Sequence, residues 1–307
     1  MGKAIRVAYG EAIAKLGHIN DKIVVLDADL SGATQTKFFK KEFPDRFYNV
    51  GIAEENLMGI AAGFAYQGFI PFASTFAVFG TGRAFEIVRN QIAYVNLNVK
   101  LALTHSGISV GEDGGSHQSV EDIAIMRSLP NMTIIVPSDA TETEKAVKAA
   151  ADFVGPVYLR LARPNAEDIT NTLDEFKIGK ANVMTDGSDA CIIATGLMVK
   201  IALDAAKELN GMGISTAVIN MHTIKPIDKE IISKYHKKCK VIVTAEEHSI
   251  IGGLGSAVAE VIAGESGSKF SMVGIEDKFG RSGNPDGLFA AYGLTKENII
   301  KKVKDNI

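Results

Sequence analysis

The chain has 307 residues, 46% of them hydrophobic and 22% charged, with a formal net charge of −3 at pH 7. The length predicts two domains of roughly 150 residues each, and the composition is typical of soluble globular proteins. The acidic balance argues against a nucleic-acid partner, and since no apolar run approaches roughly 18 residues, we expect no membrane partner either.

Short apolar runs alternate with helical patterns in the first half of the chain. Strands are expected at 23–27, 69–73, 99–104, 133–137 and 157–161. Helices are expected at 4–17, 53–67, 82–95 and 141–151. Continuous apolar strands separated by helices predict a parallel sheet that is covered on both faces.

The alternation breaks after Arg163-Pro164, in a polar stretch with two glycines. A second series follows, with strands at 190–194, 214–220, 240–244 and 270–275 and helices at 199–210, 228–235, 255–263 and 295–306. The predicted fold class is α/β, with two doubly wound domains: a larger one at 1–168, a linker at 169–187 and a smaller one at 188–307. Cys191 and Cys239 lie far apart in the sequence, which favours a reducing compartment, so we expect a cytoplasmic protein.

The stretch GIAEENLMGIAAGFA places two carboxylates, Glu54 and Glu55, at the start of a helix that is otherwise apolar. Acids in a first turn interact favourably with the helix dipole by about 0.3–1 kcal/mol each. That effect explains an exposed acid. It does not explain an apolar helix, which belongs in an interior or an interface, and a carboxyl group there suggests a function.

The stretch STFAVFGTGRAFEIVRNQIAY places Phe76 and Phe79 at the end of a predicted strand. Aromatic residues in such positions usually pack in the core. The alternative is a flat apolar slot for a heteroaromatic ring, where stacking contributes about 0.5–1.5 kcal/mol beyond the buried area.

The stretch THSGISVGEDGGSHQSVED follows another predicted strand and holds His105, Glu112, Asp113 and His117 among four glycines. Ligands of open α/β sheets bind outside the carboxyl ends of the strands. Four ionisable groups at one strand end therefore favour a functional site over a surface loop. Their spacing matches no metal-ligand motif, so no metal site is expected.

These three stretches, in this order, resemble transketolase. KAIRVAYGEAIAKLG and DADLSGATQTKFFKKEFPDRFYNVGIAEEN extend the resemblance upstream, and YLRLARPNAE and RSGNPDGLFAAYGLT extend it downstream, so that it covers essentially the whole chain. It implies a thiamine-diphosphate pyrimidine-binding domain followed by a smaller transketolase C-terminal domain. It also implies ketol transfer between sugar phosphates, as in the pentose phosphate pathway.

The resemblance assigns roles by position. Glu54 matches the carboxyl group that activates the aminopyrimidine of the cofactor, and Phe76 and Phe79 match its stacking residues. Asp29 matches a residue near the cofactor at a subunit interface. Many relatives carry a third aromatic wall, where this chain reads Gly80-Thr81-Gly82.

Substrate contacts carry over in the same way. Arg6, Arg163 and His105 match residues that bind the substrate phosphate, a role suited to arginine because its guanidinium binds oxyanions in a bidentate manner. Asp113 and His117 match residues that bind sugar hydroxyls and the donor carbonyl. The resemblance thus makes His105 and His117 catalytic candidates beside the acid. A serine that contacts phosphate in some relatives falls at Ala33, with Thr34 as a possible substitute.

One part of the family pattern is absent. No GDG motif followed by a downstream Asn occurs, although the family holds the diphosphate and magnesium with such a motif, and its single-chain members have about twice this length. The chain thus resembles the C-terminal half of a split transketolase. We expect an N-terminal partner subunit that holds Mg²⁺ and the diphosphate, self-association of this chain, and a two-plus-two heterotetramer.

Alternatives stay open at this point. Deoxyxylulose-phosphate synthase shares the helix acid and the cofactor, and the beta subunit of two-oxo-acid dehydrogenases has a similar length. A non-catalytic scaffold that binds a partner is a third possibility.

A further stretch, IIGGLGSAVAEV at 250–261, partly matches a dinucleotide fingerprint. Its third glycine position is Val258, so helix packing is the favoured interpretation.

Overall fold

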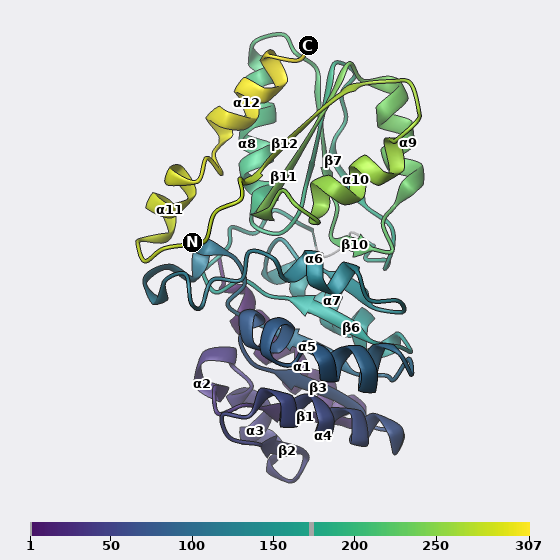
Figure 1. The fold of residues 1–307 in the computed structure, drawn as a ribbon, viewed down its shortest axis with the longest axis vertical. Helices are drawn as coiled ribbons and strands as arrows, with labels where there is room; N and C mark the ends of the chain where they lie inside the picture. The colour runs from purple at the N-terminus through teal and green to yellow at the C-terminus, as the bar shows by residue number, and fades with distance from the viewer. Residues whose placement is uncertain (1, 172–174) are drawn as a thin grey trace.

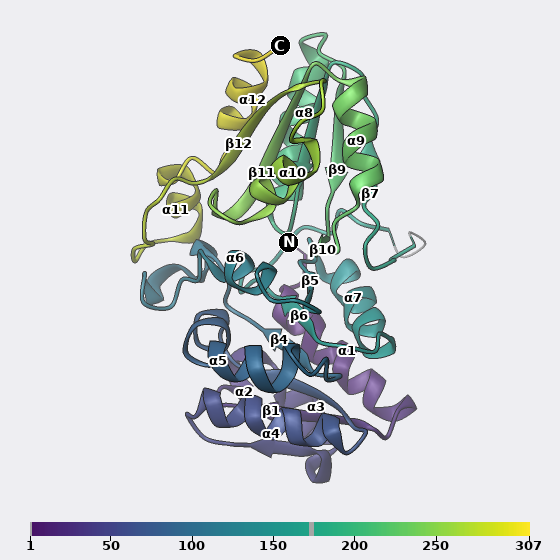
Figure 2. The ribbon, with the colours of Figure 1, turned by 45° about the vertical axis from the view of Figure 1, so that its right-hand side comes forward.

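The computed structural model describes residues 2–171 and 175–307, and it contains two α/β units stacked along the long axis of the molecule (Figures 1 and 2). The first unit has a seven-stranded sheet with the order β10-β5-β6-β4-β3-β1-β2, and the second has a five-stranded sheet with the order β12-β11-β8-β9-β7. The predicted fold class is therefore confirmed. Residues 172–174 of the expected linker lie outside the described residues.

The first unit follows the predicted alternation closely, with additions in its loops. Its strands are β1 (Ile23–Asp27), β2 (Phe47–Asn49), β3 (Ile70–Ser74), β4 (Lys100–Leu103), β5 (Thr133–Ile135) and β6 (Val157–Arg160). Its helices are α1 (Ile5–Ile19), α2 (Ser31–Thr34), α3 (Lys37–Glu42), α4 (Glu54–Tyr66), α5 (Phe85–Ile87), α6 (Asp122–Arg127) and α7 (Ala140–Asp152).

The second half of the chain also follows its predicted series. Its strands are β7 (Asn182–Thr185), β8 (Ala190–Ala194), β9 (Thr216–Asn220), β10 (Thr223–Lys225), β11 (Val241–Ser249) and β12 (Lys269–Ile275). Its helices are α8 (Met198–Gly211), α9 (Lys229–Lys238), α10 (Leu254–Ile262), α11 (Pro285–Ala291) and α12 (Lys296–Lys304).

Three strands were not expected from the sequence. β2 pairs parallel with β1 at one edge of the first sheet. β7 lies within the predicted linker and pairs antiparallel with β9 at the edge of the second sheet. β10 comes from the second half of the chain, yet it pairs antiparallel with β5 of the first sheet. The two units are therefore joined by backbone hydrogen bonds as well as by side chains.

The prediction of one regular helix at 82–95 was wrong. This segment consists of a π-helical turn at Phe79–Arg83, the short α5 and a second π-helical turn at Val88–Ala93. The glycines at 80 and 82 are poor helix formers, and a Cβ at Gly80 would lie 2.6 Å from Cδ1 of Leu103. The wide turns place Arg83 against the site described below.

The strand order explains where a site can form. From β1 the chain first adds β2 on one side, and it then crosses to add β3 and β4 on the other side. Such a reversal opens a crevice at the carboxyl ends of the strands, where α/β proteins bind ligands. α1, α3 and α7 pack on one face of this sheet, and α4 and α6 contribute to the core on the other.

Within the described residues, no helix combines the length and the apolar character needed to cross a membrane.

Candidate active site

The predicted site residues gather at the carboxyl edge of the first sheet. Each follows a strand of this sheet or begins a helix packed on it: Asp29 after β1, Glu54 at the start of α4, Phe76 and Phe79 after β3, His105 after β4, Arg163 after β6 and Arg6 at the start of α1. Segments far apart in the sequence thus supply one region of the structure, as the rule for parallel sheets requires.

The two carboxylates of the opening helix differ in environment. Glu54 is 2% exposed, and its Oε2 accepts a hydrogen bond of 2.7 Å from Nη1 of Arg83, a residue that is half exposed. Glu55 is exposed. A buried carboxylate needs a charged or hydrogen-bonding partner, and the π-helical turn after β3 supplies one. The sequence gives no direct signal for this pair, because the two residues lie 29 positions apart.

The aromatic residues form a cluster with both histidines of the site loop. The ring of Phe76 is buried and lies 3.9 Å from the ring of His105 in a stacked arrangement. Phe79 is half-buried, its ring centroid lies 5.4 Å from that of His117, and the guanidinium of Arg83 lies 4.8 Å from it. One face of Phe76 is therefore covered within the chain, and Phe79 is the more accessible platform. Arg83 directly follows Gly82, in the segment 80–82 that carries no aromatic residue.

His105 is 3% exposed and adopts a positive φ of 58°. Its Nδ1 lies 2.8 Å from Oγ1 of Thr104. Burial lowers the pKa of His105 to about 3, with further lowering from the nearby positive charges of Arg6 and Arg163. This imidazole is therefore neutral at physiological pH and can serve as a hydrogen-bond partner rather than as a cation.

Two guanidinium groups lie close together beside this histidine. Nη1 of Arg6 donates to the carbonyl of Ala33 at 2.8 Å, and Nε donates to the carbonyl of Arg163 at 3.2 Å. Burial and the charge of Arg163 lower the pKa of Arg6. Arg163 also contacts the exposed Glu112 at 3.3 Å. Two partly buried cations that repel each other form a place where an anion would be stabilised.

The remaining loop residues lie toward solvent. Asp113 is exposed and His117 is half-buried, with Nδ1 of His117 3.0 Å from Oγ of Ser116. Asp113 is the last residue of a 3₁₀ segment, Ile108–Asp113, which is kinked at Gly111 with φ of 84°, and His117 follows this segment. Their position leaves both side chains accessible to a ligand.

Asp29 is exposed and has a positive φ of 62°. Asn49, at the end of β2, holds it from both sides: its Nδ2 donates to Oδ1 of Asp29 at 2.8 Å, and its Oδ1 accepts from the backbone N–H of Asp29 at 3.1 Å. Asn49 is thus a residue of this region that the sequence analysis missed. Nothing in the sequence pattern around Asn49 indicates that it contacts Asp29, which follows β1.

The suggestion that Thr34 contacts substrate phosphate was wrong. Thr34 is fully buried, and its Oγ1 donates to Oδ2 of Asp27 at 2.7 Å. Asp27 also accepts from Thr36 and from the backbone of Leu30, so it organises the turn after β1. Ala33 contributes only its backbone carbonyl, which binds Arg6.

The dinucleotide interpretation of 250–261 does not fit the structure. The N-terminus of α10, where a pyrophosphate would bind, holds the carboxylate of Glu246, which accepts from the backbone N–H groups of Leu254 at 2.6 Å and Gly255 at 2.8 Å. A Cβ at Gly253 would lie 2.1 Å from Oε2 of Glu246. The glycine is therefore required by an internal carboxylate.

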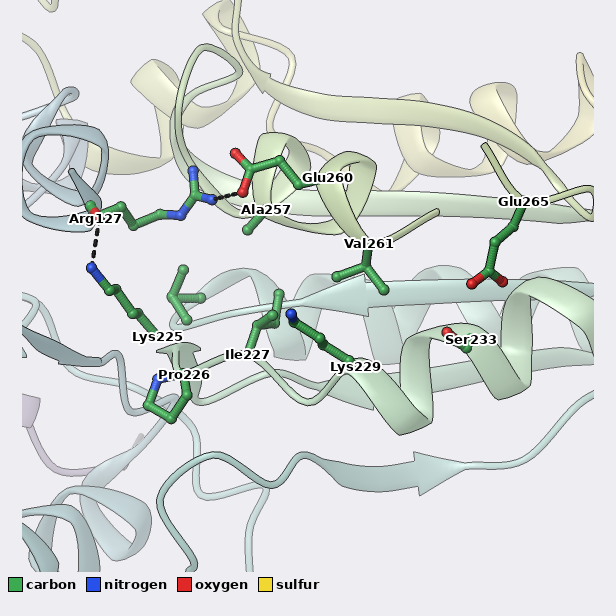
Figure 3. A pocket seen from close by; sticks show the side chains of 11 residues that line it. Arg127, Lys225, Pro226, Ile227, Lys229, Ser233, Ala257, Glu260, Val261 and Glu265 are labelled. Atoms are coloured by element: carbon green, nitrogen blue, oxygen red, sulfur yellow. Dashed lines mark hydrogen bonds and ion pairs between the residues drawn. The ribbon is translucent and has the colours of Figure 1, made fainter. Parts of the chain in front are cut away.

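A cavity of about 540 Å³ lies between α9 and α10 in the second unit, away from these residues (Figure 3). Arg127 and Lys225 line it, but both have protein partners. Arg127 pairs with Glu260 at 2.7 Å, and Lys225 donates to the carbonyls of Arg127 and Leu129. The charge of Arg127 is therefore already balanced by a carboxylate, and none of the site residues predicted from the sequence lines this cavity. Among residues 2–171 and 175–307, no group of three or more His, Cys, Asp or Glu side chains is placed to hold a metal ion.

Family comparisons match nearly the whole chain. A model described as the pyrimidine binding domain of transketolase matches residues 1–168, and one described as the transketolase C-terminal domain matches residues 179–299.

Several curated proteins are similar along the chain. A protein of Methanocaldococcus jannaschii, provisionally named a transketolase C-terminal section, is 51% identical over 99% of this chain and 96% of its own length. A 6-deoxy-6-sulfo-D-fructose transketolase subunit of Clostridium sp. is 41% identical over 97% of this chain and 92% of its own length. Transketolase of Rattus norvegicus is 40% identical over 98% of this chain, which spans 48% of the rat protein.

Solved structures of transketolases are also similar to this chain. A structure described as a split gene transketolase, inactive beta4 tetramer, superimposes with a TM-score of 0.93 and 50% identity over 99% of this chain and 98% of that chain. Transketolase from Leishmania mexicana superimposes with a TM-score of 0.84 and 26% identity over 99% of this chain and 45% of its own.

Proposed function

The chain belongs to the transketolase family, and on this premise we propose that it is the C-terminal subunit of a split transketolase that uses thiamine diphosphate. It would transfer a two-carbon ketol unit from a ketose phosphate to an aldose phosphate. The observation that carries the proposal is the convergence, at one sheet edge, of the buried carboxylate of Glu54, the partly exposed ring of Phe79 and the cationic pair Arg6 and Arg163.

These residues suit the pyrimidine end of the cofactor. Thiamine diphosphate supplies a thiazolium that becomes nucleophilic when its aminopyrimidine is correctly hydrogen-bonded, and the protein supplies position and electrostatics. Oε1 of Glu54 makes no hydrogen bond to any described residue, whereas Oε2 is held by Arg83. One oxygen is thus fixed and the other can bind a ring nitrogen. Phe79 would supply the ring for stacking, next to the buried Phe76 and the guanidinium of Arg83.

The substrate side is assigned to groups at the same sheet edge. Arg6, Arg163 and His105 would bind the phosphate. His105 lies against the aromatic cluster and is neutral, so it would act as a hydrogen-bond partner beside the two cations. Asp113 and His117 would bind sugar hydroxyls and the donor carbonyl. Asp29 would lie at the contact with another subunit, close to the cofactor.

The partner subunit would hold the diphosphate and Mg²⁺. Support comes from the relative named as a C-terminal section, from the similarity to the split gene transketolase, and from the half-length match to the rat enzyme. The structure described as an inactive beta4 tetramer also supports self-association of this chain. A two-plus-two heterotetramer would contain both kinds of contact.

A sulfonated sugar is a second substrate class, because of the similarity to the 6-deoxy-6-sulfo-D-fructose transketolase subunit. A phosphate monoester carries close to two negative charges at pH 7, which matches two guanidinium groups better than a singly charged sulfonate does. We therefore favour the phosphate. Equal specificity constants for the two substrate classes would remove this preference.

The direct test is a native pull-down of the chain from its own cells, followed by a ketol-transfer assay of the recovered complex. We expect a stoichiometric partner with a GDG motif and a downstream Asn, and transfer from a ketose phosphate to an aldose phosphate. Recovery of such a complex without transfer activity would favour the two-oxo-acid dehydrogenase or the deoxyxylulose-phosphate synthase alternative, each of which has its own assay. Recovery of no such partner would favour the non-catalytic scaffold.

A further inference from the structure

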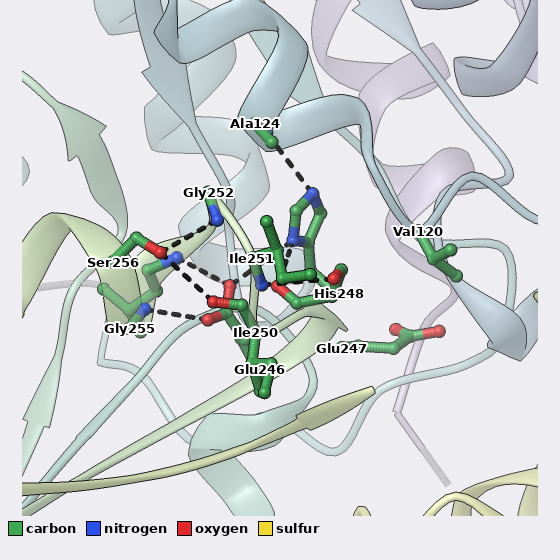
Figure 4. A network of polar contacts seen from close by, with 12 residues as sticks. Val120, Ala124, Glu246, Glu247, His248, Ile250, Ile251, Gly252, Gly255 and Ser256 are labelled. Carbon is green, nitrogen blue, oxygen red and sulfur yellow. Dashed lines mark hydrogen bonds and ion pairs between the residues drawn. The ribbon is translucent and has the colours of Figure 1, made fainter. Parts of the chain in front are cut away.

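The carboxyl end of β11 extends out of its own sheet toward the first unit. Pairing with β12 is regular as far as Ala245 and then shifts in register. The next three residues, Glu246, Glu247 and His248, are buried although all three are ionisable. Figure 4 shows Glu246 and Glu247 pointing to different sides of the strand, as alternation along a strand requires.

The three side chains have different partners. Glu246 turns back to the N-terminus of α10 in its own unit. His248 accepts at Nε2 from the backbone N–H of Ala124, at 3.3 Å, in the first unit. Oε1 of Glu247 accepts from the backbone N–H of Ser109 at 2.6 Å, and Ser109 lies in the 3₁₀ segment that leads to Asp113 and His117.

Glu247 also restricts which residue can stand next to this hydrogen bond. Gly107 has φ of 75°, and a Cβ there would lie 2.2 Å from Oε1 of Glu247. The carboxylate therefore lies directly against the start of the loop. No side chain fits between them.

The far end of the same loop is tied to the second unit as well. Nε2 of Gln118 donates to the carbonyl of Arg281 at 2.9 Å, and Oγ of Ser282 donates to the carbonyl of Glu112 at 2.7 Å. The contact between Ser282 and Glu112 is exposed and that between Gln118 and Arg281 is partly buried, so the buried contact at Glu247 is the one most protected from water.

Several charged groups face Glu247. Nη2 of Arg160, on β6, donates to its backbone carbonyl at 3.0 Å, and Arg160 is itself paired with Asp122 of α6 at 2.6 Å. Glu246 and His248 flank it on its own strand. Burial raises the pKa of Glu247 to about 7, with Arg160 acting in the opposite direction. Its charge therefore changes near neutral pH.

We propose that Glu247 is a positioning residue for the active site: it orders the loop that carries Asp113 and His117 from the side of the second unit. The ordering itself is a property of this chain. Its consequence for substrate binding rests on the proposed function. The second unit would then contribute to catalysis by fixing the substrate loop.

The first test measures the order of the loop without any activity. Hydrogen exchange is compared between the wild-type chain and its Glu247→Gln variant, which keeps the size of the side chain and removes its charge. Because hydrogen bonds to charged groups are the stronger ones, we expect peptides covering 107–118 to exchange at least about ten-fold faster. The matched control is Glu246→Gln, which alters an adjacent buried carboxylate that binds α10. It should leave the exchange of 107–118 unchanged.

The second test measures kinetics in the complex with the partner subunit. Glu247→Gln should raise KM for the sugar phosphate roughly ten-fold and remove an ionisation near pH 7 from the profile of kcat/KM, whereas Glu246→Gln should do neither. Gly107→Ala, which disturbs the same contact from the loop, should raise KM similarly.

The outcomes are separable. Unchanged exchange of the loop in Glu247→Gln would overturn the proposal, and so would faster exchange with wild-type kinetics and pH profile in an active complex. A wild-type complex without ketol transfer would instead count against the proposed function, and the exchange result would then decide by itself whether Glu247 orders the loop.

Discussion

Glu54 and Arg83 form an ion pair in which Nη1 of Arg83 lies 2.7 Å from Oε2 of Glu54, although Glu54 is almost fully buried and Arg83 is half exposed. The same guanidinium lies over the ring of Phe79. One side chain thus touches both the acid and the aromatic platform that we assign to the pyrimidine end of the cofactor. This arrangement leads to the first two predictions.

Replacing Glu54 should abolish most turnover, whereas replacing its neighbour should not. Glu54→Gln keeps the shape of the side chain but removes the carboxyl group that would activate the aminopyrimidine. We expect kcat to fall by about 10²–10⁴, the usual range for a group in acid–base catalysis. Glu55→Gln is the matched control, with a stability loss of about 0.3–1 kcal/mol from the helix dipole and little change in kcat. Steady-state assays of the complex measure kcat for both variants. An equal loss of kcat in Glu54→Gln and Glu55→Gln would refute the assignment.

Arg83 should affect the acid through position rather than through substrate binding. Arg83→Ala frees Oε2 of Glu54 and uncovers Phe79, so we expect kcat to fall roughly ten-fold with little change in KM for the sugars. Arg83→Lys should recover part of the loss, since the charge is kept. Arg89→Ala is the control, because Arg89 is exposed in the same segment and contacts Asn90. A rise in KM for the sugar phosphate without loss of kcat would contradict this role.

Arg6 and Arg163 should determine the affinity for the charged end of the substrate. Arg6→Gln or Arg163→Gln should raise KM for a ketose phosphate about ten-fold or more, in line with the loss of a charge-assisted hydrogen bond. KM for an unphosphorylated ketose should change little in the same variants. Thermal unfolding should accompany the assay, because Arg6 also holds the carbonyl of Ala33. If both substrates are equally affected, the two arginines do not bind the phosphate.

His105 should stay neutral throughout the working range of pH. Its pKa is lowered to about 3 by burial and by the neighbouring arginines, whereas an unfolded histidine titrates near pH 6.5. Between these two pH values the unfolded state therefore binds more protons than the folded state. The contribution of neutral His105 to the free energy of unfolding is present above pH 6.5 and is lost as the pH falls toward 3. Ring NMR signals of His105 should not shift between pH 8 and pH 5. Titration within that range would show that the imidazole is not buried as described.

The fold was largely predictable because its strands are continuous apolar runs. β1 and β8 were predicted with the observed bounds, since every residue in them is buried. β7 was missed because it is an edge strand without a buried face, and its polar sequence is typical of a linker. The three residues of β10 are too few to show a period, and their pairing with β5 joins segments far apart in the sequence.

The residues of the candidate site were only partly predictable from the sequence. Residues within one motif, such as His105 and His117, could be identified from a single stretch of sequence. Arg83 and Asn49 could not, because their roles depend on contacts with Glu54 and Asp29 across the sheet edge. The same limit applies to Glu247, whose partner Ser109 lies 138 positions away in the chain.

The central claim is that this chain holds one end of the cofactor and a partner holds the other. The most direct measurement is a calorimetric titration of thiamine diphosphate, with Mg²⁺ present, into the chain alone, the partner alone and their mixture. The account predicts tight binding and ketol transfer only in the mixture, and loss of this binding in the mixture that carries Glu54→Gln. Tight binding and full turnover by the chain alone would contradict it.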